Sequence, residues 1–70
     1  MNNELLKAEI KKSGFRNAYL AETLGLSFQG FANKTQGKTE FTISEVNTLI
    51  KILRLNDTKS KAIFFNSKGE

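Results

Sequence analysis

Residues 17–37 read NAYLAETLGLSFQGFANKTQG, and this stretch decides the fold. Leu20 and Leu24 are four residues apart, so both lie on one face of a helix. Gly25 interrupts the pattern, and Ser27 is a residue type that often caps the start of a helix. The stretch therefore predicts two short helices joined by a tight turn, which is the arrangement of a helix-turn-helix.

Helices are also expected along the rest of the chain, because proline is absent and strand patterns are weak. Thr42 and Glu45 have the spacing of a capping box. Four apolar residues then follow with the spacing of one helical face: Val46, Leu49, Ile50 and Leu53. The expected helices cover residues 3–12, 17–24, 28–36, 43–53 and 59–65. We predict a compact all-α bundle of five helices in a single domain, residues 1–70, with a frayed tail at residues 66–70.

Residue types at the helix ends give more detailed expectations. Asn3 is expected to cap the first helix, and either Asp57 or Thr58 is expected to cap the last one. Phe15 is expected to enter the core directly after the first helix ends.

The composition excludes several classes of function. The 70 residues include neither cysteine nor histidine, which removes the commonest metal ligands and the commonest general base. No serine is paired convincingly with a lysine base, so we expect no catalytic residues, no metal site and no cofactor. No apolar run reaches the roughly 18–20 residues of a membrane span, and no signal peptide is recognisable. A net charge of +4 permits a polyanionic partner, and the expected location is the cytoplasm.

The second helix of the predicted pair has a face suited to reading duplex DNA. Gln29, Asn33 and Gln36 are spaced i, i+4 and i+7, so their amides share one face, which carries no carboxylate. A Gln or Asn side chain can bond an adenine edge at N6 and N7. Phe28, in the first turn, could contact a thymine methyl group. We therefore predict that Phe28, Gln29 and Asn33 contact bases.

Contacts to DNA phosphates are expected from both ends of the same unit. Arg16 and Asn17 lie at the start of its first helix, where free N–H groups and a partial positive charge attract anions. Lys34, Lys38 and Thr39 cluster at the end of the second helix and in the following loop. Together these residues would hold the DNA backbone on either side of a groove and fix the register of the helix.

These residues resemble a known family. The segment Leu20-Ala-Glu-Thr-Leu-Gly-Leu-Ser27, with Phe31 four residues later and then Gly37-Lys38, resembles the phage repressor and Cro family. The resemblance covers roughly residues 5–55 and implies the five-helix lambda-repressor-like fold. It also implies a homodimer on a palindromic operator, since one such domain reads only one half-site.

The family resemblance also implies roles for single positions. It implies base contacts from three residues and phosphate contacts from three more, namely Phe28, Gln29 and Asn33, and then Asn17, Gln36 and Lys38. Two departures from the family pattern bear on packing. Arg16 stands where threonine often caps the helix, so we expect a cap weaker by about 1 kcal/mol unless Asn17 takes over. Lys34 stands where an aliphatic side chain is often buried, which leaves two alternatives, a loosely held helix or a lysine that reaches a phosphate.

The sequence predicts a sequence-specific, double-stranded DNA-binding transcriptional regulator of the phage or prophage repressor and Cro kind. It would occupy its operator in the bacterial cytosol, associated with the nucleoid. The alternative is a protein-interaction module of the same fold, antirepressor-like or antitoxin-like, which docks through Phe28 and Phe64. For the adjacent Phe64 and Phe65, either both pack against the first helix or one stays exposed as a partner contact.

Overall fold

Five helices make up the part of the chain that the structure, a computed structural model, describes, residues 1–65. In chain order they are α1 (Asn3–Ser13), α2 (Asn17–Leu24), α3 (Phe28–Thr35), α4 (Ile43–Leu53) and α5 (Asp57–Phe64). The predicted all-α class is therefore confirmed, and each helix lies close to its expected bounds. The tail expected at residues 66–70 lies outside the described residues.

The side chains that cap α1 and α5 differ from those expected. Asn2, not Asn3, caps α1 and accepts the third helical N–H at 3.0 Å. Asn56 caps α5 and accepts the third helical N–H at 2.8 Å, while Asp57 and Thr58 are the first residues of the helix itself. A capping side chain reaches that N–H from the position just before the helix, and an asparagine occupies this position in both places.

The start of α4 agrees with the sequence pattern. Thr42 Oγ1 accepts from the Glu45 N–H at 3.1 Å, and Glu45 Oε1 accepts from the Thr42 N–H at 2.9 Å, so the capping box is confirmed. Val46 and Leu49 of the predicted apolar stripe are buried. The helix begins where its cap predicts and buries the face that its pattern predicts.

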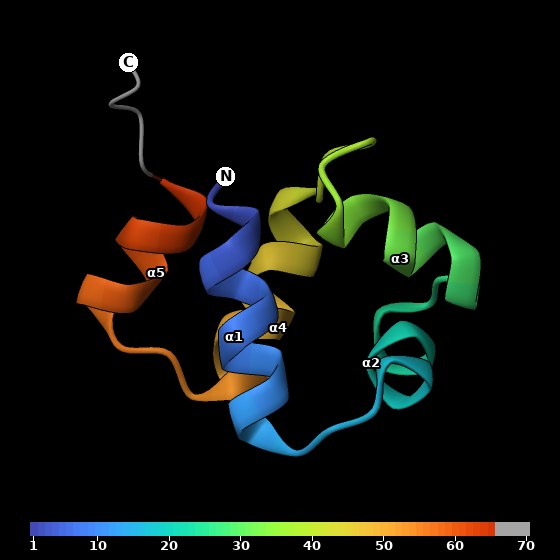
Figure 1. Ribbon diagram of the computed structural model, residues 1–70, viewed down its shortest axis with the longest axis horizontal. Coiled ribbons are helices and arrows are strands. Elements are labelled where there is room, and N and C mark those ends of the chain that lie inside the picture. Colours follow the sequence, from blue (N-terminus) through green and yellow to red (C-terminus); the bar gives the residue numbers. More distant parts are fainter. Residues whose placement is uncertain (66–70) are drawn as a thin grey trace.

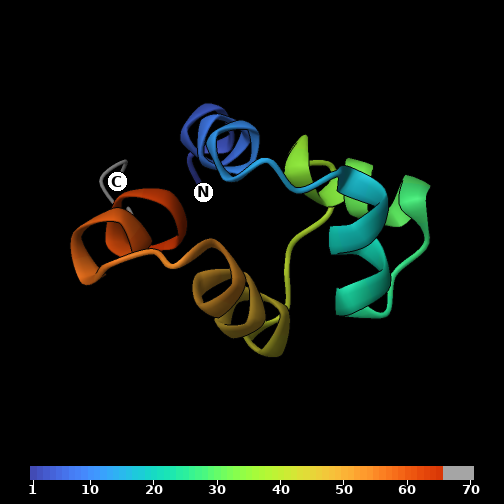
Figure 2. The same cartoon turned by 90° about the horizontal axis from the view of Figure 1, so that it is seen from below.

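The core forms around α1, which packs against α3, α4 and α5, while α2 packs against α3 (Figure 1). The largest fully buried side chains come from all five helices, one from each: Leu6, Leu20, Phe31, Leu49 and Ile63. Figures 1 and 2 show α2 and α3 together at one end of the molecule, with α5 at the other end. Within residues 1–65, no helix is long and apolar enough to cross a membrane. The described chain is therefore a compact bundle with a single core.

Two aromatic side chains, Phe15 and Phe65, lie at the surface and not in the core. Phe15 is 40% exposed and stacks on Tyr19, with ring centroids 5.2 Å apart, so the expectation that it enters the core was wrong. The turn after α1 is held by the Ser13 hydroxyl, which accepts the Phe15 N–H and leaves that ring at the surface. At the end of α5, Phe64 is partly buried against the core, whereas Phe65 is 60% exposed and meets Phe64 edge to face at 6.5 Å, so one ring of the pair stays exposed.

The end of α4 contains an arginine in a conformation that favours glycine. Arg54 has φ 55° and ψ 47°, and among residues 1–65 it is the only residue other than glycine with a positive φ. α1 and α2 end in the same left-handed conformation at Gly14 and Gly25. A Cβ in this conformation lies too close to the following carbonyl oxygen, at a cost of roughly 1–2 kcal/mol.

Arg54→Gly should therefore raise the free energy of unfolding by about 0.5–1 kcal/mol, because the added freedom of glycine in the unfolded chain offsets part of the relieved strain. Urea unfolding measures this change. The matched control is Lys51→Gly in the last turn of the same helix, which should lower the free energy of unfolding by about 0.5–1 kcal/mol. If Arg54→Gly lowered the free energy of unfolding as Lys51→Gly does, the conclusion that the backbone is strained at Arg54 would be wrong.

Candidate nucleic-acid interface

A three-residue turn, Gly25 to Ser27, connects α2 to α3 and fixes how α3 begins. Gly25 has φ 74°, and the Leu26 N–H donates to a carbonyl of α2 at 2.9 Å. Ser27 Oγ caps α3 by accepting the Gly30 N–H at 2.9 Å. Phe31 is fully buried on the inner side of α3. The start and the inner side of α3 are thus held by the rest of the protein.

The outer side of α3 carries an amide pair. Gln29 is exposed and Asn33 is half-buried, and Gln29 Nε2 donates to Asn33 Oδ1 at 3.0 Å. This bond uses one donor of Gln29, so its Oε1 and its second amide hydrogen remain available. Phe28, in the first turn, is 59% exposed, and Gln36 at the other end is exposed as well. The three predicted base-contacting residues therefore lie at least partly at the surface of one short helix.

The start of α2 has no side-chain cap. Arg16 occupies the cap position with an extended backbone and makes no capping hydrogen bond, and the first turn contains no acidic residue. The expectation of a weak cap is confirmed, and Asn17 does not take over because it is the first residue of the helix. The first N–H groups of α2 and the positive end of its dipole are therefore open to an anion.

Lys34, a predicted phosphate contact, forms an ion pair within the protein. Its Nζ is 2.7 Å from Glu45 Oε1, and the two side chains are only 16% and 14% exposed. The same Nζ lies 5.9 Å from the centre of the Phe41 ring. The ion pair explains how a lysine can occupy a place near the core, because a partly buried charge needs a partner. The phosphate contact of Lys34 therefore stays a prediction, and it would require this lysine to leave Glu45.

A groove of about 360 Å³ lies between α1, the start of α2 and the end of α3. We call it the α1–α3 groove and define it by six of its lining residues, Lys7, Lys11, Phe15, Asn17, Thr35 and Gln36. It brings together two predicted phosphate-contacting residues, Asn17 and Gln36. Sequence reasoning missed Lys7 and Lys11, although their i, i+4 spacing places them on one face of α1.

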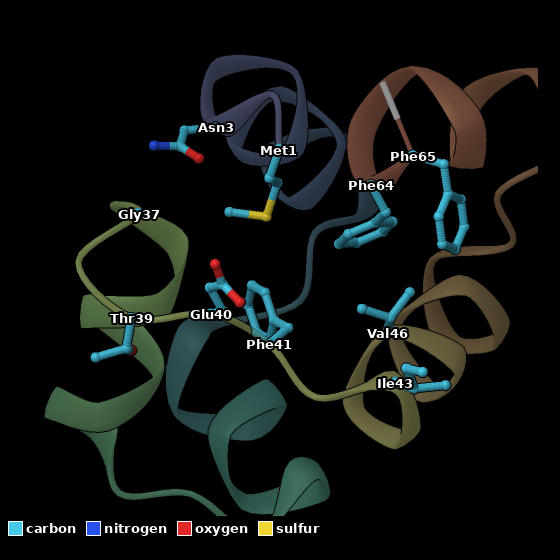
Figure 3. A pocket seen from close by; sticks show the side chains of 10 residues that line it. All are labelled: Met1, Asn3, Gly37, Thr39, Glu40, Phe41, Ile43, Val46, Phe64 and Phe65. Atoms are coloured by element: carbon cyan, nitrogen blue, oxygen red, sulfur yellow. The ribbon is translucent and has the colours of Figure 1, made fainter. Parts of the chain in front are cut away.

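A second cleft, of about 510 Å³, lies between the N-terminus, the loop after α3, the start of α4 and the end of α5 (Figure 3). Met1, Ile43 and Phe65 line this apolar cleft and are 45%, 80% and 60% exposed. Thr39, a predicted phosphate contact, lines this apolar cleft and not the α1–α3 groove. Lys38 is exposed in the same loop. The molecule thus has a cationic groove and an apolar cleft, lined by different residues.

Comparisons with known proteins give no information on the function of these surfaces. No family model matches the chain, and no curated protein or solved structure matches it. Within residues 1–65, no group of three histidine, cysteine, aspartate or glutamate side chains is placed to hold a metal ion. The functional assignment therefore depends on the surfaces described above.

Glu45 connects the end of α3 to the start of α4. Partial burial of its carboxylate favours the neutral form, but hydrogen bonds from Lys34 and Thr42 and the charge of Lys34 outweigh it. The pKa of Glu45 therefore lies below its ordinary value of 4.5. A carboxyl group whose pKa is lowered by folding stabilises the protein above its unfolded pKa, and this contribution is lost as the pH falls through the folded pKa.

Glu45→Gln should lower the free energy of unfolding at pH 7 by about 1 kcal/mol, because the amide retains a capping oxygen but loses the charge that faces Lys34. Its stability should also fall less steeply than that of the wild type as the pH drops below about 4.5. Urea unfolding over a series of pH values measures both effects.

The control for this experiment is Glu40→Gln, which removes an exposed carboxylate from the loop just before α4. It should leave stability at pH 7 within about 0.5 kcal/mol of the wild type. Equal stability of Glu45→Gln and the wild type at pH 7 would contradict a stabilising role for the ion pair.

Proposed function

We propose that the protein is a sequence-specific, double-stranded DNA-binding transcriptional regulator. In this proposal α2, the turn from Gly25 to Ser27 and α3 form a helix-turn-helix, and α3 enters the major groove. The observation that carries the proposal is the accessible amide pair Gln29–Asn33, which lies on a helix whose other side is fixed by the buried Phe31. The resemblance of this segment to the phage repressor and Cro family supports the same function.

The amide pair suits recognition of an A·T base pair. Gln29 Oε1 can accept from adenine N6, and the amide hydrogen of Gln29 that Asn33 does not use can donate to N7. Asn33 orients Gln29 and keeps its own NH₂ group for a neighbouring base or phosphate. Phe28 adds an apolar surface that fits a thymine methyl group. These three residues are therefore the proposed base-reading group.

Phosphate contacts in this proposal come from the two sides of α3. On one side, Arg16 and Asn17 stand at the uncapped start of α2. On the other side, Lys38 and Thr39 are exposed in the loop after α3. Gln36, exposed at the end of α3, completes the group that would position the helix on the backbone.

A homodimer on a palindromic operator follows from the same proposal, because one α3 helix reads only one half-site. Occupying the operator is itself the regulatory act, so the mechanism calls for no cofactor. The proposed place of action is the bacterial cytosol, on the nucleoid, as for the repressor and Cro proteins that the sequence resembles.

Selection from a random duplex library at near-physiological salt tests this function. We expect a palindromic motif bound with a Kd of about 10⁻⁸ M or tighter. Gln29→Ala and Asn33→Ala should each weaken binding to this motif by about 1–3 kcal/mol. The first removes the amide that contacts the base, and the second removes the amide that orients Gln29. Fluorescence anisotropy measures the loss.

Asn47→Ala is the matched control, because it removes an exposed amide from α4, outside the proposed helix-turn-helix. Its affinity for the selected motif should equal that of the wild type. Unchanged binding by Gln29→Ala and Asn33→Ala would refute the role of the amide pair.

The protein-interaction module is retained as a second candidate function because of one observation. Phe15, in the turn before α2, is 40% exposed, Tyr19 on α2 is 51% exposed, and Phe28 on α3 is 59% exposed. Exposed aromatic side chains are common at the centre of protein interfaces. A library selection that enriches no duplex sequence would favour this second function over DNA reading.

A further inference from the structure

We propose that α1 is part of the DNA-binding surface and that the α1–α3 groove receives a backbone phosphate through Lys7 and Lys11. This inference rests on the proposed function and extends it to a helix outside the helix-turn-helix. The groove, not the helix-turn-helix pattern, points to these two lysines, since both line it together with Asn17 and Gln36.

The two lysines are free to bind an anion. Both are exposed, and neither forms an ion pair within residues 1–65. Other lysines of the described chain differ in this respect, since Lys12 lies 3.9 Å from Glu9 and Lys34 lies 2.7 Å from Glu45. Lys7 and Lys11 are thus positive charges that no carboxylate of the described chain neutralises by direct contact.

The rest of the α1–α3 groove is lined by two amides, Thr35 and three apolar side chains, which are Ile10, Phe15 and Ala32. No aspartate or glutamate lines it, so an approaching phosphate meets no carboxylate there. Asn17 and Gln36 contribute amide N–H donors, and the Thr35 hydroxyl is already used, since it donates to the Ala32 carbonyl at 2.9 Å. The polar groups of the groove that remain available to an anion are therefore two ammonium groups and two amides, beside the uncapped start of α2.

The position of the groove makes the DNA backbone the expected source of this phosphate. Gln36 is the residue that ends α3, and Asn17 begins α2, so the groove adjoins both helices of the proposed reading unit. Figure 1 shows the C-terminal end of α3 turned toward α1. A duplex that lies against the outer side of α3 would therefore bring its backbone past the end of α3 and toward α1.

The test compares Lys7→Gln, Lys11→Gln and the double variant with the wild type on the selected duplex and on an unrelated duplex. Each lost phosphate contact should reduce the slope of log affinity against log salt by about 1. The loss should be similar for both duplexes, because a phosphate contact carries no sequence information. Lys61→Gln is the matched control, because it removes an exposed lysine of α5 that has no ion pair within residues 1–65, and its slope should stay at the wild-type value.

The outcomes separate this inference from the proposed function. Wild-type slopes in all three lysine variants, with duplex binding intact, would overturn the role of α1 and leave the DNA-binding function in place. No binding of any duplex by the wild-type protein would overturn both. A titration with inorganic phosphate, followed by NMR, distinguishes the two sources of the anion. Saturable shifts at Lys7 and Lys11 without any effect of their substitution on duplex binding would mark a free-anion site and refute the contact to DNA.

Discussion

The burial of Phe31 is the contact on which the candidate interface depends. α3 has only eight residues, and an isolated helix of that length is unstable in water. Phe31 is fully buried, and its ring meets Phe41 edge to face at 6.2 Å. Because Phe31, together with the buried Thr35, fixes the inner side of α3, the amides on the outer side have a defined position. The proposed base contacts need that fixed position, since base recognition depends on the direction of each hydrogen bond.

The ion pair of Lys34 and Glu45 supports the same arrangement from the end of α3. Glu45 caps α4 through the Thr42 N–H and also binds the Lys34 ammonium. One carboxylate thus fixes the start of one helix and the end of another. Both side chains of this pair are mostly buried, so a shielded charge interaction joins the end of α3 to the start of α4.

Local patterns in the sequence were enough to predict the helices, because spacing and capping act over three or four residues. The capping box of Thr42 and Glu45 is an example. Contacts between distant segments could not be predicted in this way. Lys34 meets a partner eleven residues along the chain, and nothing near Lys34 in the sequence indicates it. The α1–α3 groove was missed for the same reason, because Lys7 and Gln36 come together only in the folded chain.

The two hollows of the surface differ in the charge of the residues that line them. Two lysines without an ion pair in residues 1–65 line the α1–α3 groove, whereas the charged residue of the apolar cleft is Glu40, beside exposed apolar side chains such as Ile43 and Phe65. Thr39 lies at the apolar cleft, so the loop after α3 runs close to both surfaces. Lys7 and Lys11 thus place two positive charges at the α1–α3 groove, whereas no lysine or arginine of the described chain lines the apolar cleft.

The bond between Gln29 and Asn33 has a consequence for the thermodynamics of association. A free glutamine on a helix surface samples several rotamers, and immobilising it at an interface costs about 0.5–1.5 kcal/mol. In this protein the Gln29 side chain is already restrained by Asn33 before any partner arrives. Part of the conformational entropy is thus lost during folding, so a ligand that accepts this rotamer meets a smaller entropic penalty when it binds.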